Sequence, residues 1–522
     1  MEKEHADTQG DEDSSILKSA LFKVTTGTTI TMTGTVIFLV LSLLWRVVVV
    51  RLITVNEWGE MSLVLAFIGV LTALAPLGIQ TSIARNIAYA AEEDRGSIVR
   101  SGLMITTVSG LICTVAIAAL ANQIAGIFRN PGLVTVIYVL SPSIVVGMVI
   151  GTLASVFQGF QDAVPYAIFV NILPNVLSLS IALLLYSMGF GFFGILLSAV
   201  LNSVIVGAVI SFYSRRKLRV YMKPGPRKNM SRMLLAFGLP LLVVFGLNAL
   251  MGYADTLIMG YFTNESIVGY YSSGITLGRI VSFSLSAMTY IFMPVASQMI
   301  SRKRFDYLER TYSTAMKWSL LTSVPLMAIF ILYPGQSLSL TFGPEYSVAR
   351  SVLAVSAAGA FVISVFGPAA STLVAFGRTR LLAVNSAISV SFNITACLVL
   401  IPRYGMVGGA YASVVGTIAF ALLSLAEVSY LYRLQPFNRL YVKPLTASLA
   451  LSFIILLPLH LRPNLIELPV IFLAVAICVI FCILVTKSVD KTDVLVLEVV
   501  EEILGRKLTR IRRIGTMLIG KT

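Results

Sequence analysis

Apolar stretches of about 20 residues follow one another along nearly the whole chain, separated by short polar segments. A stretch of this length is what an α-helix needs to cross the hydrocarbon core of a bilayer. About fourteen such stretches can be counted, and they begin near residues 26, 60, 100, 133, 164, 190, 233, 269, 311, 347, 380, 406, 441 and 466. The pattern therefore predicts an all-α polytopic membrane protein with about 14 transmembrane helices.

Composition supports this prediction. Hydrophobic residues make up 57% of the 522 residues, charged residues make up 12%, and the mean hydropathy is +0.89. Such values exclude an ordinary soluble globular protein. The segment Met1 to Ser15 is acidic and polar, and the first apolar run is longer than the apolar core of a cleavable signal peptide. We therefore expect the N-terminus to stay in the cytoplasm.

Lysine and arginine gather in alternate connections between the predicted spans. Because positively charged residues near helix ends are retained on the cytoplasmic side, this asymmetry orients the protein. With an even number of spans, it places both termini in the cytoplasm and predicts a multi-pass protein of the plasma membrane. The net charge of +15 is then mainly a topology signal. It also attracts anionic membrane lipids, and no nucleic-acid partner is needed to explain it.

The sequence contains two copies of a six-span unit in the same orientation. The segment from Asn56 to Ser62 lies between the first two spans, as the segment from Ser266 to Ser272 lies between spans 7 and 8. Glycines and an asparagine recur further on at nearly the same spacing, at Gly159, Asn175, Gly191 and Gly194 and again at Gly377, Asn393, Gly405 and Gly408. Parallel repeats pack as two pseudo-symmetric lobes, and we expect the substrate site between them.

The duplication predicts six segments. They are a cytoplasmic N-terminal tail over residues 1–23, an N-lobe of helices 1–6 over 24–213, a basic cytoplasmic linker over 214–232, a C-lobe of helices 7–12 over 233–432, two extra C-terminal helices over 433–486, and a cytoplasmic amphipathic tail over 487–522. In that tail, apolar positions recur at helical spacing among basic residues. This favours a helix on the cytoplasmic leaflet over a docking site for a glycosyltransferase.

Charged residues inside the spans are candidates for the functional site, because a charge at that depth costs about 2.5 kcal/mol or more and usually lines a polar cavity. Arg46 lies about one turn from the outer end of span 1, and its planar guanidinium matches phosphate oxygens. Arg279 lies near the middle of span 8 among small polar residues, which are typical of a helix that lines a wet cavity. Both are predicted to bind substrate, and pairing with an internal carboxylate is the alternative for Arg46.

Three further cations lie nearer the ends of their spans. Arg51 lies at the outer boundary of span 1, and Arg85 and Lys317 lie near the cytoplasmic ends of spans 2 and 9. Each is a candidate substrate-binding residue. For Arg51 a position at the interface explains the charge at least as well, and for Arg85 and Lys317 the orientation signal does so.

Two carboxylates complete the candidate site. The repeat alignment places Asp255, in span 7, at nearly the depth of Arg46. Asp255 is predicted either to close one state of a cavity through a salt bridge to Arg46 or to couple transport to an ion gradient. A permanent structural pair is the alternative. Glu427 in span 12 is the second ion-coupling candidate, with a salt bridge to Arg433 or Arg439 as the alternative.

Four short segments carry a family resemblance: Arg51 to Gly59, Leu77 to Ile79 with Arg85, Phe342 to Tyr346, and Pro402 to Ala410. In this order they resemble polysaccharide and oligosaccharide-lipid flippases of the multidrug/oligosaccharidyl-lipid/polysaccharide exporter superfamily. The resemblance implies a two-lobe, fourteen-helix fold that moves a polyprenyl-linked saccharide from the cytoplasmic to the outer leaflet. It also implies a substrate that carries a phosphate or pyrophosphate.

The predicted function is therefore a flippase for a polyprenyl-(pyro)phosphate-linked oligosaccharide that works by alternating access through a cationic central cavity. A cation-coupled multidrug antiporter and a cell-wall lipid-precursor flippase of the same superfamily are the alternatives. Span 1 has no internal Asp or Glu, which disfavours the antiporter. Short outer connections disfavour a membrane glycan polymerase or ligase, so we predict no enzymatic activity.

No metal site is predicted, and the only predicted cofactor is a coupling ion, H⁺ or Na⁺. The expected partners are the lipid-linked oligosaccharide, membrane lipids and glycan-assembly enzymes, and the protein itself is expected to be a monomer.

Overall fold

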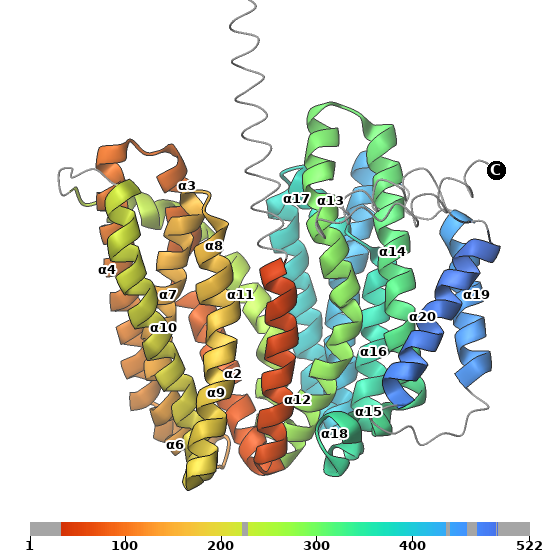
Figure 1. Ribbon diagram of the computed structural model, residues 1–522, viewed down its shortest axis with the longest axis horizontal. Helices are drawn as coiled ribbons and strands as arrows, with labels where there is room; N and C mark the ends of the chain where they lie inside the picture. Colours follow the sequence, from red (N-terminus) through yellow and green to blue (C-terminus); the bar gives the residue numbers. More distant parts are fainter. Residues whose placement is uncertain (1–32, 222–227, 435–438, 457–466, 487, 489–522) are drawn as a thin grey trace, which may run out of the picture. The chain divides into compact units, whose positions relative to one another are not determined.

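The computed structural model describes residues 33–221, 228–434, 439–456, 467–486 and 488. These residues form helices joined by short turns (Figure 1), which confirms the predicted all-α fold class. Within these ranges, nine helical segments are long and apolar enough to cross a membrane. The protein is therefore a multi-pass membrane protein, while the number of fourteen crossings stays a prediction. The tail predicted over 1–23 and the amphipathic tail, apart from Ser488, lie outside the described residues.

The described helices group into two compact units. The first unit comprises the chain up to Ile53 and the segment Ile68–Gly246, and the second comprises Thr54–Phe67 and the chain from Leu247 onward. Two helices are thereby divided: α2 (Val55–Leu74) after Phe67, and α11 (Ser231–Phe262) after Gly246. The domain limits that the sequence predicts remain predictions.

The first unit also contains a helix at Thr33–Leu52, α3 (Ile79–Tyr89), α4 (Glu92–Ala119), α5 (Ala121–Ile127), α6 (Gly132–Leu140), α7 (Pro142–Gly159), α8 (Ala163–Tyr166), η1 (Ala167–Ile172), α9 (Leu173–Leu185), η2 (Tyr186–Phe190) and α10 (Gly191–Tyr221). Ile79, Ile83 and Ile87 recur every four residues along α3, and all three are fully buried in a cluster with Phe157 of α7. This spacing puts the three side chains on one face of the helix, which explains why α3 packs on α7.

The end of the predicted basic linker is fixed to the start of α4. The backbone N–H of Lys228 donates a hydrogen bond to Ser97 Oγ at 3.2 Å, and that of Met230 donates to Ser101 Oγ at 3.1 Å. Lys228 Nζ lies 2.9 Å from Asp94 Oδ1, and this hydrogen bond raises the pKa of Lys228 above its ordinary value. The start of α11 is therefore anchored to the rest of the first unit.

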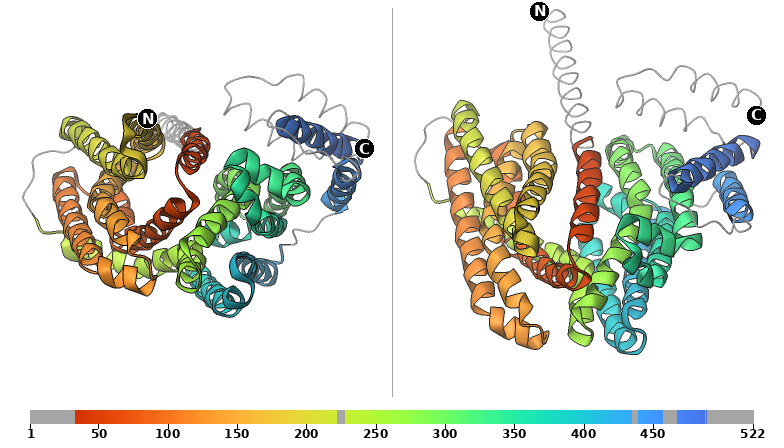
Figure 2. Two further views of the ribbon diagram at one scale, coloured as in Figure 1. Left: turned by 90° about the horizontal axis from the view of Figure 1, so that it is seen from below. Right: turned by 60° about the horizontal axis from the view of Figure 1, so that its bottom comes forward.

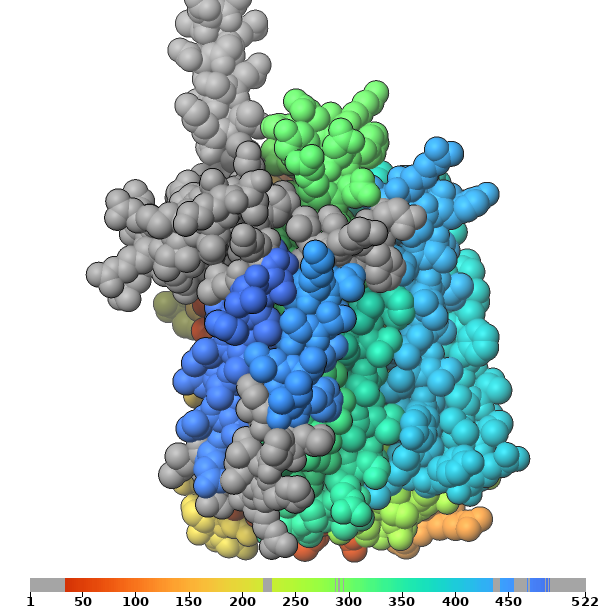
Figure 3. Space-filling model, turned by 90° about the vertical axis from the view of Figure 1, so that its right-hand side faces the viewer, coloured from red at the N-terminus to blue at the C-terminus, as the bar shows by residue number. Residues whose placement is uncertain are grey.

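The second unit continues with α12 (Glu265–Arg279), η3 (Ile280–Ser282), α13 (Phe283–Ser301), α14 (Phe305–Leu332), α15 (Pro334–Thr341), η4 (Pro344–Ala349), α16 (Arg350–Phe366), α17 (Ala369–Ala375), α18 (Thr379–Tyr432), α19 (Arg439–Leu456) and α20 (Glu467–Val485). Figure 2 shows α19 and α20 (blue) at the edge of this unit, and Figure 3 shows them from outside, packed against the green helix α14. Leu321 and Val324 of α14 bury their side chains against Val479 and Ile483 of α20. The two predicted extra helices therefore attach to the second unit through α14.

One unusual backbone conformation occurs at equivalent glycines of the two repeats. Gly191 has φ 53° and ψ −136°, and Gly405 has φ 56° and ψ −134°. This region is essentially restricted to glycine because a side chain there would be strained. Gly191 separates η2 from α10, and Gly405 separates the two arms of α18. The repeat alignment that pairs these two glycines therefore agrees with the backbone geometry.

Candidate functional site

A buried carboxylate on α11 forms the centre of a polar cluster in the second unit. Asp255 is only 1% exposed. Its Oδ1 accepts hydrogen bonds from the Thr256 backbone N–H at 2.7 Å and from Thr256 Oγ1 at 3.2 Å. Its Oδ2 accepts one from the hydroxyl of Tyr271 at 2.7 Å. Both carboxylate oxygens thus have donors, as a charge removed from water requires.

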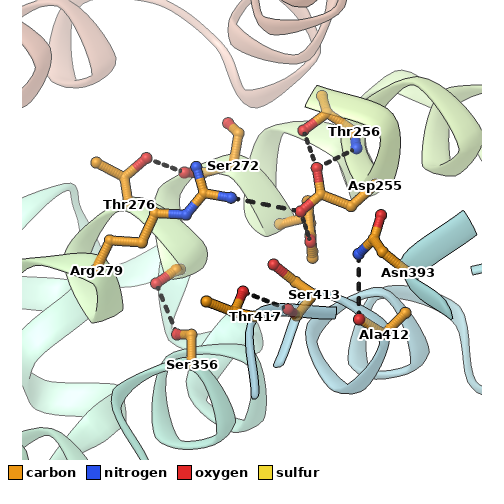
Figure 4. Close-up of polar contacts among 12 residues, drawn as sticks. Asp255, Thr256, Ser272, Thr276, Arg279, Ser356, Asn393, Ala412, Ser413 and Thr417 are labelled. Carbon is orange, nitrogen blue, oxygen red and sulfur yellow. Dashed lines mark hydrogen bonds and ion pairs between the residues drawn. The ribbon is translucent and has the colours of Figure 1, made fainter. Parts of the chain in front are cut away.

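Arg279, the last residue of α12, provides the cation beside this carboxylate. Its Nη2 lies 3.6 Å from Asp255 Oδ2 (Figure 4). Its side chain is 50% exposed. The two charges can attract one another at this distance, but the distance exceeds that of a hydrogen bond. Arg279 therefore balances a buried negative charge while half of its side chain stays exposed.

Small residues along α12 allow its neighbours to approach closely. A Cβ at Gly278 would clash with Ser356 of α16, and one at Gly274 would lie 2.9 Å from Val352 of the same helix. On another side, the ring of Tyr271 lies 3.1 Å from the position of a Cβ at Gly409 in α18. This packing fixes Tyr271, and with it the hydrogen bond to Asp255.

Asn393 of α18 is buried, and its Nδ2 donates a hydrogen bond to the carbonyl of Ala412 at 3.1 Å (Figure 4). The contact joins the two arms of α18 across the kink at Gly405. Among the residues that the structure describes, the Oδ1 of Asn393 has no hydrogen-bond partner. The sequence drew attention to Asn393 only as a marker of the repeat, because no sequence pattern shows which side-chain atom is left without a donor.

α12 also meets α2, and it does so through equivalent positions of the two repeats. The Ser266 hydroxyl donates a hydrogen bond to Asn56 Oδ1, and Ser62 and Ser272 share one of 3.0 Å between their hydroxyls. The members of each pair are 210 positions apart. This is the offset of the repeat alignment in this region, so each residue contacts its own counterpart.

Two glycines allow this crossing. Gly59 and Gly269 are also equivalent, and a Cβ at Gly269 would lie 2.5 Å from Val55 O and 3.3 Å from Gly59 N. Trp58 is fully buried next to them and donates its Nε1–H to Ser273 Oγ at 3.1 Å. The close backbone approach and the buried indole together make this a tight contact.

The structure brings together two of the predicted site residues, Asp255 and Arg279, and the sequence had not predicted that they pair. Arg46 lies half-buried in the helix Thr33–Leu52 of the first unit, and Arg51 lies exposed at its end. The exposed Arg85, on α3 of the same unit, has its guanidinium 4.3 Å from the ring centre of Phe237. The predicted pairing of Arg46 with Asp255 stays a prediction.

The two remaining predicted residues have surroundings of their own. Lys317 of α14 is 4% exposed, and its Nζ donates to the carbonyl of Ser488 at 3.0 Å, just after α20. Glu427 is half-buried on the second arm of α18, and its Oε2 accepts a hydrogen bond of 2.8 Å from Asn385 Nδ2 of the first arm. The roles predicted for both residues remain predictions.

The described residues form an all-helical membrane fold in which a half-exposed cation lies beside a buried carboxylate, a combination that is typical of membrane transporters. Residues 48–351 match the polysaccharide biosynthesis protein family. Because this match covers more than half of the chain, the protein belongs to that family.

Two relatives are similar in sequence. The chain is 24% identical over 234 residues to the probable low-salt glycan biosynthesis flippase Agl15 of Haloferax volcanii. The aligned region covers 45% of this chain and 49% of that protein. It is 20% identical over 423 residues to the uncharacterized membrane protein MJ1068 of Methanocaldococcus jannaschii, which covers 75% of this chain and 82% of that protein. The match thus spans about half the length of the first relative.

Solved structures share the fold. The lipid II flippase MurJ, in an inward closed conformation, matches with a TM-score of 0.72 and 15% identity over 89% of this chain and 99% of that chain. An inward-facing multidrug resistance MATE family transporter of the MOP superfamily matches with a TM-score of 0.63 and 16% identity over 76% of this chain and 96% of that chain. The chain therefore shares the fold of these transporters, and its membership of the polysaccharide biosynthesis protein family agrees with the resemblance that its motifs carry.

Proposed function

We propose that this protein carries a polyprenyl-(pyro)phosphate-linked oligosaccharide from the inner to the outer leaflet by alternating access. Membership of a polysaccharide biosynthesis family and similarity to a glycan biosynthesis flippase support this substrate class. A charged head group that carries sugars cannot cross hydrocarbon unaided. The protein would supply a hydrated cationic path for the head group while the polyprenyl tail stays in lipid.

The observation that carries the proposal is the half-exposed side chain of Arg279 beside the buried Asp255. A cation at the depth of a membrane helix is costly unless it is paired or functional. Asp255 reduces that cost, and half of the Arg279 side chain remains exposed. The planar fork of arginine suits the oxygens of a phosphate. Arg279 is therefore the residue that we expect to contact the phosphate or pyrophosphate of the substrate.

Asp255 is the residue that we propose for ion coupling. When ionised, it attracts Arg279 from 3.6 Å. Protonation, or binding of a sodium ion, would remove or offset its charge and so weaken this attraction. Arg279 would then be released to the substrate in one state and held by Asp255 in the other. A ligand shifts such an equilibrium only through a difference of this kind between the two states.

The test is a flipping assay in proteoliposomes with a fluorescent lipid-linked oligosaccharide. Arg279→Ala should lower the flipping rate about tenfold or more, because a hydrogen bond to a charged group is worth about 1.5–3 kcal/mol. Arg279→Lys keeps the charge but loses the fork, and an intermediate rate is expected. The matched control is Arg302→Ala, which removes an exposed arginine from the turn after α13. Unchanged flipping in Arg279→Ala would refute the role of Arg279.

Folding must be tested separately, because Arg279→Ala leaves a buried carboxylate without its cation. The double variant Asp255→Asn/Arg279→Ala removes both charges and should unfold at a higher temperature than Arg279→Ala alone. If Arg279 binds the substrate, flipping stays low in the double variant. If Arg279 serves only to balance Asp255, flipping recovers together with stability.

A cation-coupled multidrug antiporter is the second candidate, and the buried carboxylate of Asp255 favours it. The same proteoliposomes decide between the two functions. Export of small organic cations without flipping of the lipid-linked oligosaccharide would replace the proposed function by the antiporter. Flipping of a cell-wall lipid precursor in preference to the oligosaccharide would instead identify a precursor flippase.

A further inference from the structure

Each repeat ties a turn at its predicted cytoplasmic end to the last helix of that repeat. In the first repeat, the turn follows α7 and ends at Asp162. Lys217 Nζ, near the end of α10, lies 2.6 Å from Asp162 Oδ2 and 2.8 Å from the hydroxyl of Tyr213. Because a carboxylate and an ammonium group meet here, this contact is neutral overall.

The corresponding turn of the second repeat follows α17 and has the same backbone. Gln161 and Gly377 are both left-handed, with φ 59° and 72°. The next residue in each repeat, Asp162 or Arg378, donates its N–H to the carbonyl five positions before it, at 2.9 Å in both cases. Arg378 therefore occupies the position that Asp162 occupies in the first repeat. The backbone thus pairs Gly377 with Gln161, two positions beyond the Gly159 with which the glycine spacing of the sequence pairs it.

The charge at this position has opposite signs in the two repeats. Arg378 Nε donates a hydrogen bond to the hydroxyl of Tyr432, at the end of α18, at 3.0 Å. The ring of Tyr432 stacks on Phe376 with 3.5 Å between ring centroids, which fixes the hydroxyl. Tyrosine is neutral, so this contact holds Arg378 in place without cancelling its charge.

A cavity of 830 Å³ opens beside this contact, lined by residues 377–381 and by 426–427 and 430–431. Arg378 and Arg380 provide two positive charges and Glu427 one negative charge, so the lining residues sum to +1. Residues 377–381 also include the start of α18, where the helix dipole adds positive potential. Tyr430 is 86% exposed and Leu431 43% exposed, so the lining also offers apolar surface.

We propose that this cavity binds the head group of an anionic phospholipid of the cytoplasmic leaflet. The charge of +1 complements the single negative charge of a phosphodiester. The two arginines would hold its oxygens, because guanidinium groups match phosphate geometry. Glu427, oriented by Asn385, would accept a hydrogen bond from a head-group hydroxyl. Tyr430 and Leu431 would contact the adjoining acyl region, and phosphatidylglycerol has all of these features.

The experiment measures lipid binding to the purified full-length protein by native mass spectrometry. The probes are phosphatidylglycerol and phosphatidylcholine with identical acyl chains. The double variant Arg378→Gln/Arg380→Gln should weaken phosphatidylglycerol binding about tenfold or more, from the loss of charge-assisted hydrogen bonds. Binding of phosphatidylcholine should be weak in all proteins and equal among them.

The matched control is Arg302→Gln/Lys303→Gln, which removes the same charge from an exposed turn of the second unit outside the cavity. This control should bind phosphatidylglycerol like the wild type. Equal losses in the two double variants would overturn the proposal, because they would show attraction to a basic surface in general. Millimolar inorganic phosphate should not displace the lipid, and displacement would assign the cavity to a free phosphate ion instead. The readout needs no transport, so its outcome is independent of the proposed function.

Discussion

Asp255 shows how a single carboxylate is retained inside a membrane protein. It lies almost fully out of contact with solvent, and hydrogen bonds from Thr256 and Tyr271 replace its hydration. The cation of Arg279 adds a longer-range attraction. Because two neutral donors lie closer to the carboxylate than the cation does, the hydrogen bonds and the ion pair can be altered separately.

Replacing Tyr271 by Phe should destabilise the protein, because it removes one donor to a buried carboxylate and leaves the ring in place. The expected loss is about 1–3 kcal/mol, seen as a lower midpoint of thermal unfolding in detergent. Tyr270→Phe is the matched control, since the ring of Tyr270 packs edge-on against Tyr346 and Phe preserves that contact. Equal midpoints for the two variants would contradict the importance of the Tyr271 hydroxyl.

Lys317→Met separates a structural role of this lysine from substrate binding. The buried Nζ donates to Ser488 O, so its loss should loosen the end of α20 and cost about 1.5–3 kcal/mol. We expect the midpoint of thermal unfolding to fall in Lys317→Met. Assayed at a temperature at which it remains folded, the variant should still flip its substrate. Lys443→Met, at an exposed position of α19, is the control. Loss of flipping at unchanged stability would instead support the substrate-binding role predicted from the sequence.

At this scale the sequence identifies charges but not their partners. Asp255 and Arg279 attract attention individually because charges are rare in membrane spans. Their pairing depends on how α11 and α12 are rotated, which a nearly uniform apolar pattern does not reveal. The hydrogen bond from Tyr271 to Asp255 was not predicted, because nothing local in the sequence shows where a hydroxyl will point.

Among the helices, α18 illustrates both the strength and the limit of the apolar pattern. The two stretches beginning near residues 380 and 406 predict two spans, and the structure has two arms separated at Gly405. The short helices α5 and α15, and the π-helical turns η1 and η2, were not predicted. Their apolar residues merge with neighbouring spans, and a change in hydrogen-bond register leaves no trace in hydropathy.

Gly191→Ala and Gly405→Ala should each destabilise the protein by about 1–3 kcal/mol, the cost of a side chain in this backbone region. At both glycines an added Cβ would meet no atom within 4 Å, so the effect is conformational and not steric. Gly147→Ala in α7 is the matched control, because it has the same open space and no positive φ. This control should be neutral or stabilising by up to about 1 kcal/mol. The measurement is the midpoint of thermal unfolding of the three variants, each compared with the wild type.

The crossing of α2 and α12 can be tested by a disulfide between Asn56→Cys and Ser266→Cys. In a background with the four native cysteines replaced, oxidation should stop flipping if the repeats separate here during alternating access. Reduction should restore it. Each single variant under the same oxidant is the control. A fully cross-linked protein that flips at the normal rate would show that this contact stays closed throughout the transport cycle.

For the molecule as a whole, the distribution of Lys and Arg makes a prediction about sidedness. Lys303, in the turn after α13, and Arg403, in the kink of α18, are both exposed. Each can be replaced by a single cysteine. The charge asymmetry places the first in the cytoplasm and the second outside. A membrane-impermeant maleimide should label Arg403→Cys in intact cells and Lys303→Cys only after permeabilisation. The opposite pattern would invert the topology.

The fold class and the family resemblance could be predicted from the sequence, because hydropathy and short motifs are read along the chain. The division of α2 and α11 between the two compact units was not predicted. The apolar pattern predicts each span as one continuous helix. It carries no information on where along that helix the packing partners change.

The contacts between counterparts in α2 and α12 also bear on the history of the chain. When a residue touches its own equivalent, as Ser62 touches Ser272, the geometry is that of a homodimer about a twofold axis. An ancestor of half this length would have met a second copy of itself at the same glycine, and every mutation there would have changed both sides at once. Fusion of two such copies would remove that restriction. The two halves could then differ in charge, as Asp162 and Arg378 do, while the contact between counterparts is kept inside one polypeptide.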